Sequence, residues 1–233
     1  MDVPVDSQRE AQQESLHQRR ATAALSGHRG DPVAAMAAAG DTEPSVRLLG
    51  FGALARLGLL QQDHAQRGLN DADSRVVRRV LEAVAGTGRT AQGEGSGLID
   101  SRLVELLAAS DDAVAETAAW ALGERHQQTE SGPRTDVSSE EQAVIVGALC
   151  TAAVDHHDAL VRESAAAALG AIGLEAGLDA ILRATQDKAT VRRRAILALA
   201  SFDGPDVLAA LERARTDRDW QVRQAAEDLL RAP

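Results

Sequence analysis

Residues 158–173 read Asp158-Ala-Leu-Val161-Arg162-Glu-Ser-Ala-Ala-Ala-Ala-Leu169-Gly170-Ala-Ile172-Gly173 and decide the fold. Val161, Ala165, Leu169 and Ile172 recur at intervals of three or four residues, which is the spacing of one helix face. Asp158 comes three residues before Val161, where a carboxylate can accept the free N–H groups of a first helical turn. The stretch therefore predicts an amphipathic helix that begins just after Asp158.

This pattern occurs six times along the chain. With Val161 as the anchor, an apolar residue follows each anchor by eight positions, and an acid precedes it by three positions in five of the six copies. Lys188 replaces the acid in the remaining copy. The other anchors are Val46, Val76, Val114, Val191 and Val222. Six copies in one register indicate an internal repeat rather than a single globular core.

A small residue follows the +8 position in five copies, as Gly170 follows Leu169, and should let a neighbouring helix approach closely. A second amphipathic segment lies ahead of each anchor helix, for example at 98–108, 140–153 and 176–184. One helix pair cannot bury its apolar face alone, so the pairs must stack.

These observations predict an all-α chain that forms a right-handed α-solenoid of about six antiparallel helix pairs. Residues 1–29 are expected to form an N-terminal capping helix, with disorder as the alternative for its first residues. Residues 30–233 form the repeat domain. The two longest anchor spacings predict insert loops at about 88–97 and 126–138, and the sequence Ser138-Ser-Glu-Glu141 is a capping-box signature that opens the next helix.

The repeat resembles the HEAT repeat, and in particular the short bacterial version also seen in phycobilin lyase-like proteins. The resemblance covers roughly residues 31–231. It implies a stack whose second helices line a concave face. It also implies a ladder between adjacent repeats, formed by the arginine after the anchor and nearby acids. The candidate members of that ladder are Arg47, Arg162, Arg192 and Arg223, with Asp158, Asp187 and Asp219.

The composition of the chain argues against several classes of partner and location. The formal net charge of −10 argues against nucleic acid as the main partner, because phosphate binding needs clustered basic residues. Cys150 is the only cysteine, which excludes an intramolecular disulfide, and it is expected to be a buried, inert thiol. The N-terminus has no apolar signal region, and no stretch approaches the ~20 apolar residues of a membrane span. The sequence predicts a cytoplasmic protein.

Catalytic motifs are missing from the sequence. HEAT-like hydroxylases use His-Glu pairs, and no histidine here is followed by glutamate. There is no Gly-x-Ser-x-Gly motif and no phosphate-binding loop. The pair His156-His157 is expected to be a polar turn rather than a metal site. The chain is therefore predicted not to be an enzyme and to hold no metal or cofactor.

The second, third and sixth residues after each anchor should point away from the core and line the concave face. The candidate partner-binding residues at these positions are Trp120, Glu116, Arg78, Arg79, Glu163, Arg193 and Arg194. Tryptophan and arginine are frequent energetic anchors of protein interfaces. Two interpretations of Trp120 stay open at this point: an interface residue, or a side chain that fills a gap in the core. Trp220 is expected to pack on the C-terminal cap.

The leading hypothesis is a protein-interaction scaffold or adaptor that binds a partner protein or peptide on the concave face. The alternative is a lyase-like accessory protein or chaperone for a cofactor-bearing client, and nucleic-acid processing ranks third. A monomer is favoured, since the polar first helix and the charged last helix discourage end-to-end stacking.

Overall fold

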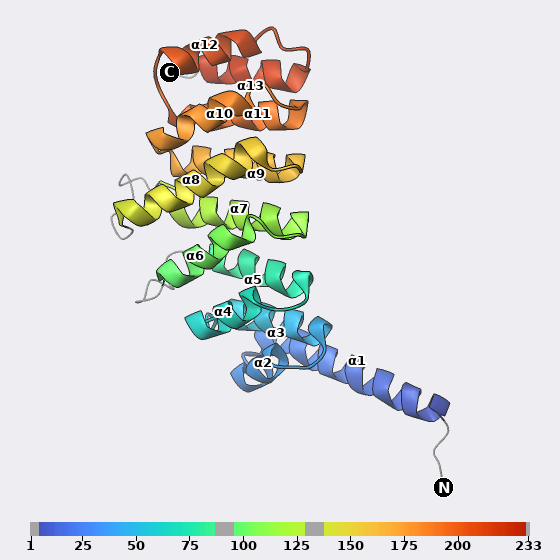
Figure 1. The fold of residues 1–233 in the computed structure, drawn as a ribbon. Helices are drawn as coiled ribbons and strands as arrows, with labels where there is room; N and C mark the ends of the chain where they lie inside the picture. The colour runs from blue at the N-terminus through green and yellow to red at the C-terminus, as the bar shows by residue number, and fades with distance from the viewer. Residues whose placement is uncertain (1–4, 87–95, 129–137, 232–233) are drawn as a thin grey trace. The chain divides into compact units, whose positions relative to one another are not determined.

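The computed structural model describes residues 5–86, 96–128 and 138–231, and in these ranges every regular element is helical. The chain divides into two compact units, Met1–Ala91 and Gln92–Pro233. Each unit is a stack of antiparallel helix pairs, which confirms the predicted all-α solenoid class (Figure 1). Within the described ranges, no helix combines the length and the apolar character that crossing a bilayer requires.

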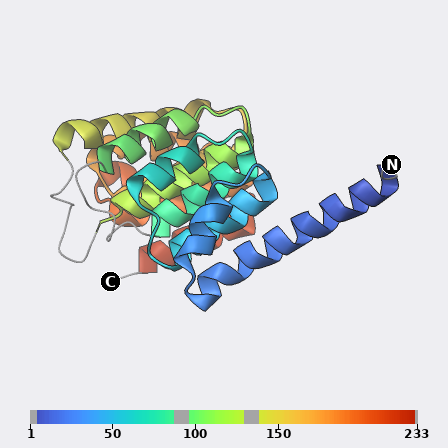
Figure 2. The same ribbon diagram turned by 90° about the horizontal axis from the view of Figure 1, so that it is seen from below.

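The first unit contains one long helix and two helix pairs. Its elements are α1 (Val5–Arg29), α2 (Pro32–Ala39), α3 (Pro44–Arg56), α4 (Gln62–Leu69) and α5 (Ser74–Gly86). Helix α1 packs on both α2 and α3, and α3 packs in turn on α5. The N-terminal half of α1 extends past the helices that it contacts (Figure 2). Helix α1 therefore occupies the place that a second helix of a preceding repeat would have.

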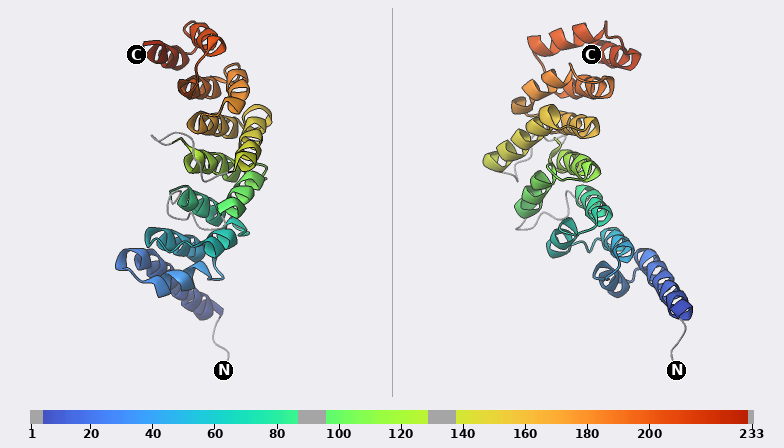
Figure 3. Two further views of the ribbon diagram at one scale, coloured as in Figure 1. Left: turned by 90° about the vertical axis from the view of Figure 1, so that its left-hand side faces the viewer. Right: turned by 45° about the vertical axis from the view of Figure 1, so that its right-hand side comes forward.

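The second unit contains four helix pairs. Its elements are α6 (Ser96–Leu106), α7 (Asp112–His126), α8 (Ser139–Asp155), α9 (Ala159–Ile172), η1 (Glu175–Gly177), α10 (Leu178–Ala184), α11 (Ala189–Ala198), η2 (Leu199–Ser201), α12 (Pro205–Ala214) and α13 (Trp220–Arg231). Helices α7, α9, α11 and α13 pack side by side in one layer, and α6, α8 and α10 form part of the other (Figure 3).

All six anchor valines are buried, with at most 3% of their surface exposed. The +8 residues are buried too, from Leu54 to Leu199, whereas Leu230 of α13 is half-buried. The core is thus built mainly from valine, leucine and alanine, as the repeat predicts.

The predicted helix starts are correct where the acid is aspartate. Asp111 accepts a hydrogen bond from the Ala113 N–H, and Asp158 accepts from those of Leu160 and Val161. Ser138 and Glu141 form the complete capping box. Glu43 makes no such cap; its longer side chain accepts from the Ser45 hydroxyl instead.

The small residue after the +8 position has the predicted role. A Cβ atom on Gly123 would lie 2.8 Å from Cα of Ala168, and one on Gly170 would lie 2.7 Å from Cα of Ala198. Both distances are shorter than any ordinary carbon contact, so glycine sets the spacing of α7, α9 and α11. The predicted insert loops at 88–97 and 126–138 lie largely outside the described residues. Of the second loop, Gln128 is described, and it bonds to Ala171 and Gly173 at the end of α9.

Candidate partner-binding face

A ladder of buried and half-buried arginines joins successive repeats within each unit. Arg162 binds Asp187 through two hydrogen bonds of 2.5 and 2.9 Å, and Arg192 binds Asp217 through two of 2.7 and 2.8 Å. Arg47 binds Asp71 in the same way in the first unit, at 2.7 Å for both bonds. Such bidentate pairs are the strongest form of the arginine–carboxylate contact. The predicted ladder is therefore confirmed for Arg47, Arg162 and Arg192.

The acids of the ladder differ in part from those predicted. Asp219 and Asp158 use their carboxylates to cap their own helices, and Asp217 takes the place expected for Asp219. Arg223 bonds to the backbone oxygens of Asp217 and Arg218. The acid three residues before the anchor is thus a cap. The partner of the arginine lies one or two residues earlier, in the turn between the two helices of a pair.

The ladder should make the folded state sensitive to acid. The hydrogen bonds from Arg162 and Arg192 hold the pKa values of Asp187 and Asp217 below the usual 3.8, against the opposing effect of burial. A carboxyl with a lowered folded pKa stabilises the fold above its unfolded pKa, and this contribution is lost as pH falls through the folded pKa.

We expect the free energy of unfolding to fall as pH drops below about 4, and to fall less steeply in the double variant Asp187→Asn, Asp217→Asn. Urea unfolding measured at several pH values checks this. Equal slopes for the wild type and the double variant below about pH 4 would contradict it.

A buried polar cluster that the sequence did not reveal joins α6 to the end of α7. Asp100 accepts from Arg125 Nε at 2.6 Å, and its other oxygen lies 3.1 Å from His126 Nε2, without the alignment of a full hydrogen bond. Burial raises the pKa of Asp100, but the contacts with His126 and Arg125 outweigh burial and lower it. No sequence motif marks this cluster, because single charged residues are common in surface helices.

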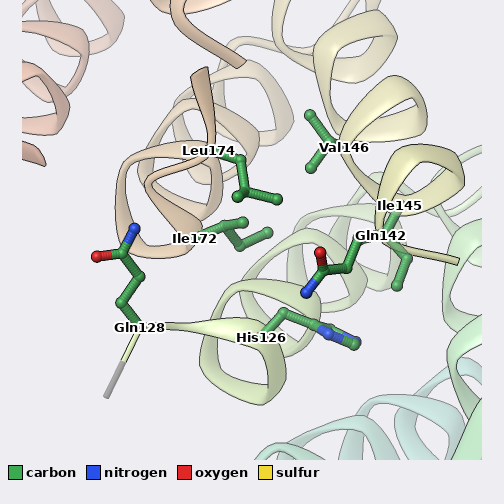
Figure 4. A pocket seen from close by; sticks show the side chains of 7 residues that line it. All are labelled: His126, Gln128, Gln142, Ile145, Val146, Ile172 and Leu174. Atoms are coloured by element: carbon green, nitrogen blue, oxygen red, sulfur yellow. The ribbon is translucent and has the colours of Figure 1, made fainter. Parts of the chain in front are cut away.

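His126 also lines a small cavity between α7, α8 and α9, together with Gln128, Gln142 and apolar side chains (Figure 4). Its volume of about 10 Å³ is room for roughly one water molecule. The cavity is therefore too small for an organic ligand.

Trp120 lies on α7 with 42% of its surface exposed. This side chain is therefore not fully buried in the core, and its role as a partner-binding residue stays a prediction. Glu116, one turn earlier on α7, is half-buried, and its backbone oxygen accepts from the Ser164 hydroxyl of α9 at 3.0 Å. The second position after the anchor of α7 thus lies next to the third position after the anchor of α9.

Three other predicted residues continue this surface in the second unit. Glu163 of α9 lies 3.5 Å from Nε of Arg194 on α11, and Arg193 is exposed. Leu197, at the same repeat position as Trp120, is 36% exposed. We call this surface the second-helix face; its members are Glu116, Trp120, Glu163, Arg193, Arg194 and Leu197.

The remaining two predicted residues, Arg78 and Arg79, lie on α5 in the first unit and line a hollow of about 480 Å³. The sequence could not show that α1 contributes to this hollow, because the repeat pattern does not extend into α1.

Two further predictions concern the burial of Trp220 and Cys150. Trp220 is 64% exposed, so the prediction that it packs on the C-terminal cap is wrong; it begins α13 and points outward from the core. Cys150 is half-buried rather than buried, and burial followed by the charge of Asp179 raises its pKa, which favours the thiol over the thiolate.

The turn at His156 and His157 lies against Asp112 at the start of α7. His157 Nε2 is 3.1 Å from an Asp112 oxygen, and the two imidazoles stack with centroids 4.6 Å apart. Potential ligand atoms of the three residues lie within 4.8 Å of one another. His156 Nδ1, however, accepts from the Asp158 N–H, so this atom is already used by the turn. The turn before α9 thus makes a polar contact with the start of α7.

Comparison with known proteins agrees with the repeat architecture. Residues 146–231 match the family of HEAT repeats. No curated protein sequence matches the chain.

Solved structures of similar fold come from designed and natural repeat proteins. An engineered protein is 21% identical, with a TM-score of 0.58; the match covers 86% of this chain but only 57% of that one. A designed armadillo repeat protein is 18% identical, with a TM-score of 0.54, over 91% of this chain and 97% of the design. The complex of CpcE and CpcF of phycocyanin lyase from Nostoc sp. PCC7120 is 19% identical, with a TM-score of 0.56, over 85% of this chain and 75% of that chain.

At these identities the structural matches report the fold alone, and that fold is a stack of helical repeats. The chain has the fold of HEAT-like repeat proteins, and residues 146–231 match the HEAT-repeat family.

Proposed function

We propose that this chain is a non-enzymatic scaffold or adaptor that binds a partner protein or peptide on the second-helix face. The observation that carries the proposal is Trp120, a large aromatic side chain held 42% exposed at the middle of a helix. Tryptophan is enriched among the residues that dominate interface energies, because it buries a large area at little entropic cost. Its neighbours on this face, Glu163 and Arg194, supply the polar surroundings typical of such a site.

The fold supports the same function. A designed armadillo repeat protein of similar fold, with a TM-score of 0.53, has been solved in complex with the peptide (KR)4. The CpcE and CpcF match is likewise a complex of two chains. Stacked helix pairs offer an extended surface of repeated positions, which suits an elongated partner segment.

A matched pair of variants tests the proposal. Affinity capture with the wild-type chain should recover a partner that Trp120→Ala loses, while Trp220→Ala retains it. Trp220 is the right control, because it is also exposed but lies at the start of α13, away from the second-helix face. We expect Trp120→Ala to weaken the purified complex by about 2 kcal/mol, or roughly thirtyfold. Equal effects of the two substitutions would place the partner elsewhere.

The lyase-like alternative is testable by titrating a bilin into the protein. We expect the absorbance spectrum of the bilin to stay unchanged, since no observation on the second-helix face favours a tetrapyrrole. A red-shifted, saturable spectrum would support the alternative.

A further inference from the structure

The hollow on the first unit is formed by three helices. Helix α1 contributes its last turns, α3 contributes its outward positions, and α5 closes the other side. We call it the basic hollow; its lining residues are Ala24, Gly27, His28, Leu48, Leu49, Gly52, Ala53, Arg56, Arg78, Arg79 and Glu82. Its volume of about 480 Å³ is large enough for several side chains of a partner.

The floor of the basic hollow is apolar. Leu48 and Leu49 are half-buried there, and Gly52 and Ala53 are buried. A Cβ on Gly27 would lie 3.0 Å from Cα of Ala53, so α1 and α3 approach closely behind the floor. This floor can accept an apolar side chain such as leucine.

The rim of the basic hollow carries an excess of positive charge. Arg56, Arg78 and Arg79 line it, against the single acid Glu82. Arg79 contacts Glu82 at 3.2 Å, and its guanidinium lies so close to α3 that a Cβ on Gly52 would be 2.8 Å from its Nε. Glycine at position 52 therefore makes room for this arginine on the rim.

Two of these arginines have no acidic partner among the described residues. Arg56 contacts only the ring nitrogens of His28 there, and Arg78 is exposed without a hydrogen bond or ion pair. The ladder arginines differ in this respect, since Arg47 in the same unit is bound to Asp71 through two bonds. In a chain with a net charge of −10, two guanidinium groups without a described acidic partner, above an apolar floor, form a local site of opposite sign.

We infer that the basic hollow binds an acidic segment of a partner protein, with carboxylates on Arg56 and Arg78 and an apolar side chain on the floor at Leu48 and Leu49. Arginine binds carboxylates through charge-assisted and often bidentate hydrogen bonds, which fits such a segment. The inference rests on the proposed scaffold function and adds the chemistry of one partner segment.

A pair of fluorescently labelled peptides, (Glu-Leu)4 and (Lys-Leu)4, tests it by anisotropy titration at low ionic strength on the full chain. Non-specific attraction to a protein of net charge −10 favours the basic peptide, so a preference for the acidic one must come from a local site. We expect (Glu-Leu)4 to bind about tenfold tighter than (Lys-Leu)4. Equal binding, or tighter binding of (Lys-Leu)4, would overturn the inference.

Charge reversal then locates the site. Arg78→Glu should weaken (Glu-Leu)4 binding by about tenfold, whereas Arg67→Glu should leave it within about twofold. Arg67 is also exposed, but it lies on α4 and does not line the hollow. Unchanged melting temperatures of both variants confirm folding, and the milder Arg78→Gln should give an intermediate loss. Similar losses for Arg67→Glu and Arg78→Glu would overturn the inference.

Failure of this inference can be told apart from failure of the proposed function. If Trp120→Ala still loses a captured partner while (Glu-Leu)4 shows no preference, the scaffold function stands and the basic hollow is not its acidic-segment site. If (Glu-Leu)4 binds as expected but no capture depends on Trp120, the proposed second-helix face is the part that fails.

Discussion

Replacing Asp187 with alanine is expected to lower the free energy of unfolding by about 3 kcal/mol. Asp187 accepts two hydrogen bonds from Arg162, whose side chain is only 10% exposed. Removing the carboxylate leaves a buried guanidinium with the backbone oxygens of His156 and His157 as its remaining partners. An uncompensated buried charge is among the most destabilising defects that a single substitution can create. Urea unfolding followed by circular dichroism measures the change.

The control is Asp203→Ala, which removes an exposed carboxylate from the same unit. Asp203 makes no ion pair in the described residues, and we expect a change within about 0.5 kcal/mol. If the two alanine variants unfolded at the same urea concentration, the arginine ladder would not be a source of stability.

Identical glycine-to-alanine changes at two helix positions are expected to have opposite effects. Gly170→Ala places a Cβ within 2.7 Å of the Ala198 backbone and forces α9 and α11 apart, at a cost of about 1–3 kcal/mol. Gly147→Ala, in the middle of α8, meets no atom within 4 Å and should gain up to about 1 kcal/mol, because alanine is the better helix former.

The difference between these two variants isolates packing from helix propensity, since the propensity gain is common to both. Both free energies are measured in the same urea titration. A stabilising effect of Gly170→Ala would mean that α9 and α11 are not in close contact and that the repeat spacing is set by other residues.

Local patterns in the sequence were sufficient to predict the fold class. The anchor valines and the +8 leucines are buried because helical periodicity alone places them on one stripe, and Gly170 was recognisable from its position after Leu169. The capping box at Ser138 was equally local. The ion pairs of the ladder were harder to predict, because the conformation of a short turn decides whether Asp217 or Asp219 binds Arg192.

The candidate site could be predicted only in part, because it depends on contacts between segments that are distant in the sequence. The position of Trp120 in the repeat indicated the groove, but alanine-rich helices also use tryptophan to fill gaps, so its exposure had to be observed. The buried pair Asp100 and Arg125 joins helices without a shared motif. The basic hollow depends on α1, which carries no copy of the repeat, and on the way Arg79 lies over Gly52.

Fluorine NMR of the chain labelled with fluorotryptophan tests the central claim most directly. The chain has two tryptophans, so the spectrum holds two resonances, and Trp220→Phe assigns them. When the captured partner is added, we expect the Trp120 resonance to shift and broaden while that of Trp220 stays in place, because the partner covers the second-helix face and not the start of α13. A bound partner that leaves the Trp120 resonance unchanged would contradict the account.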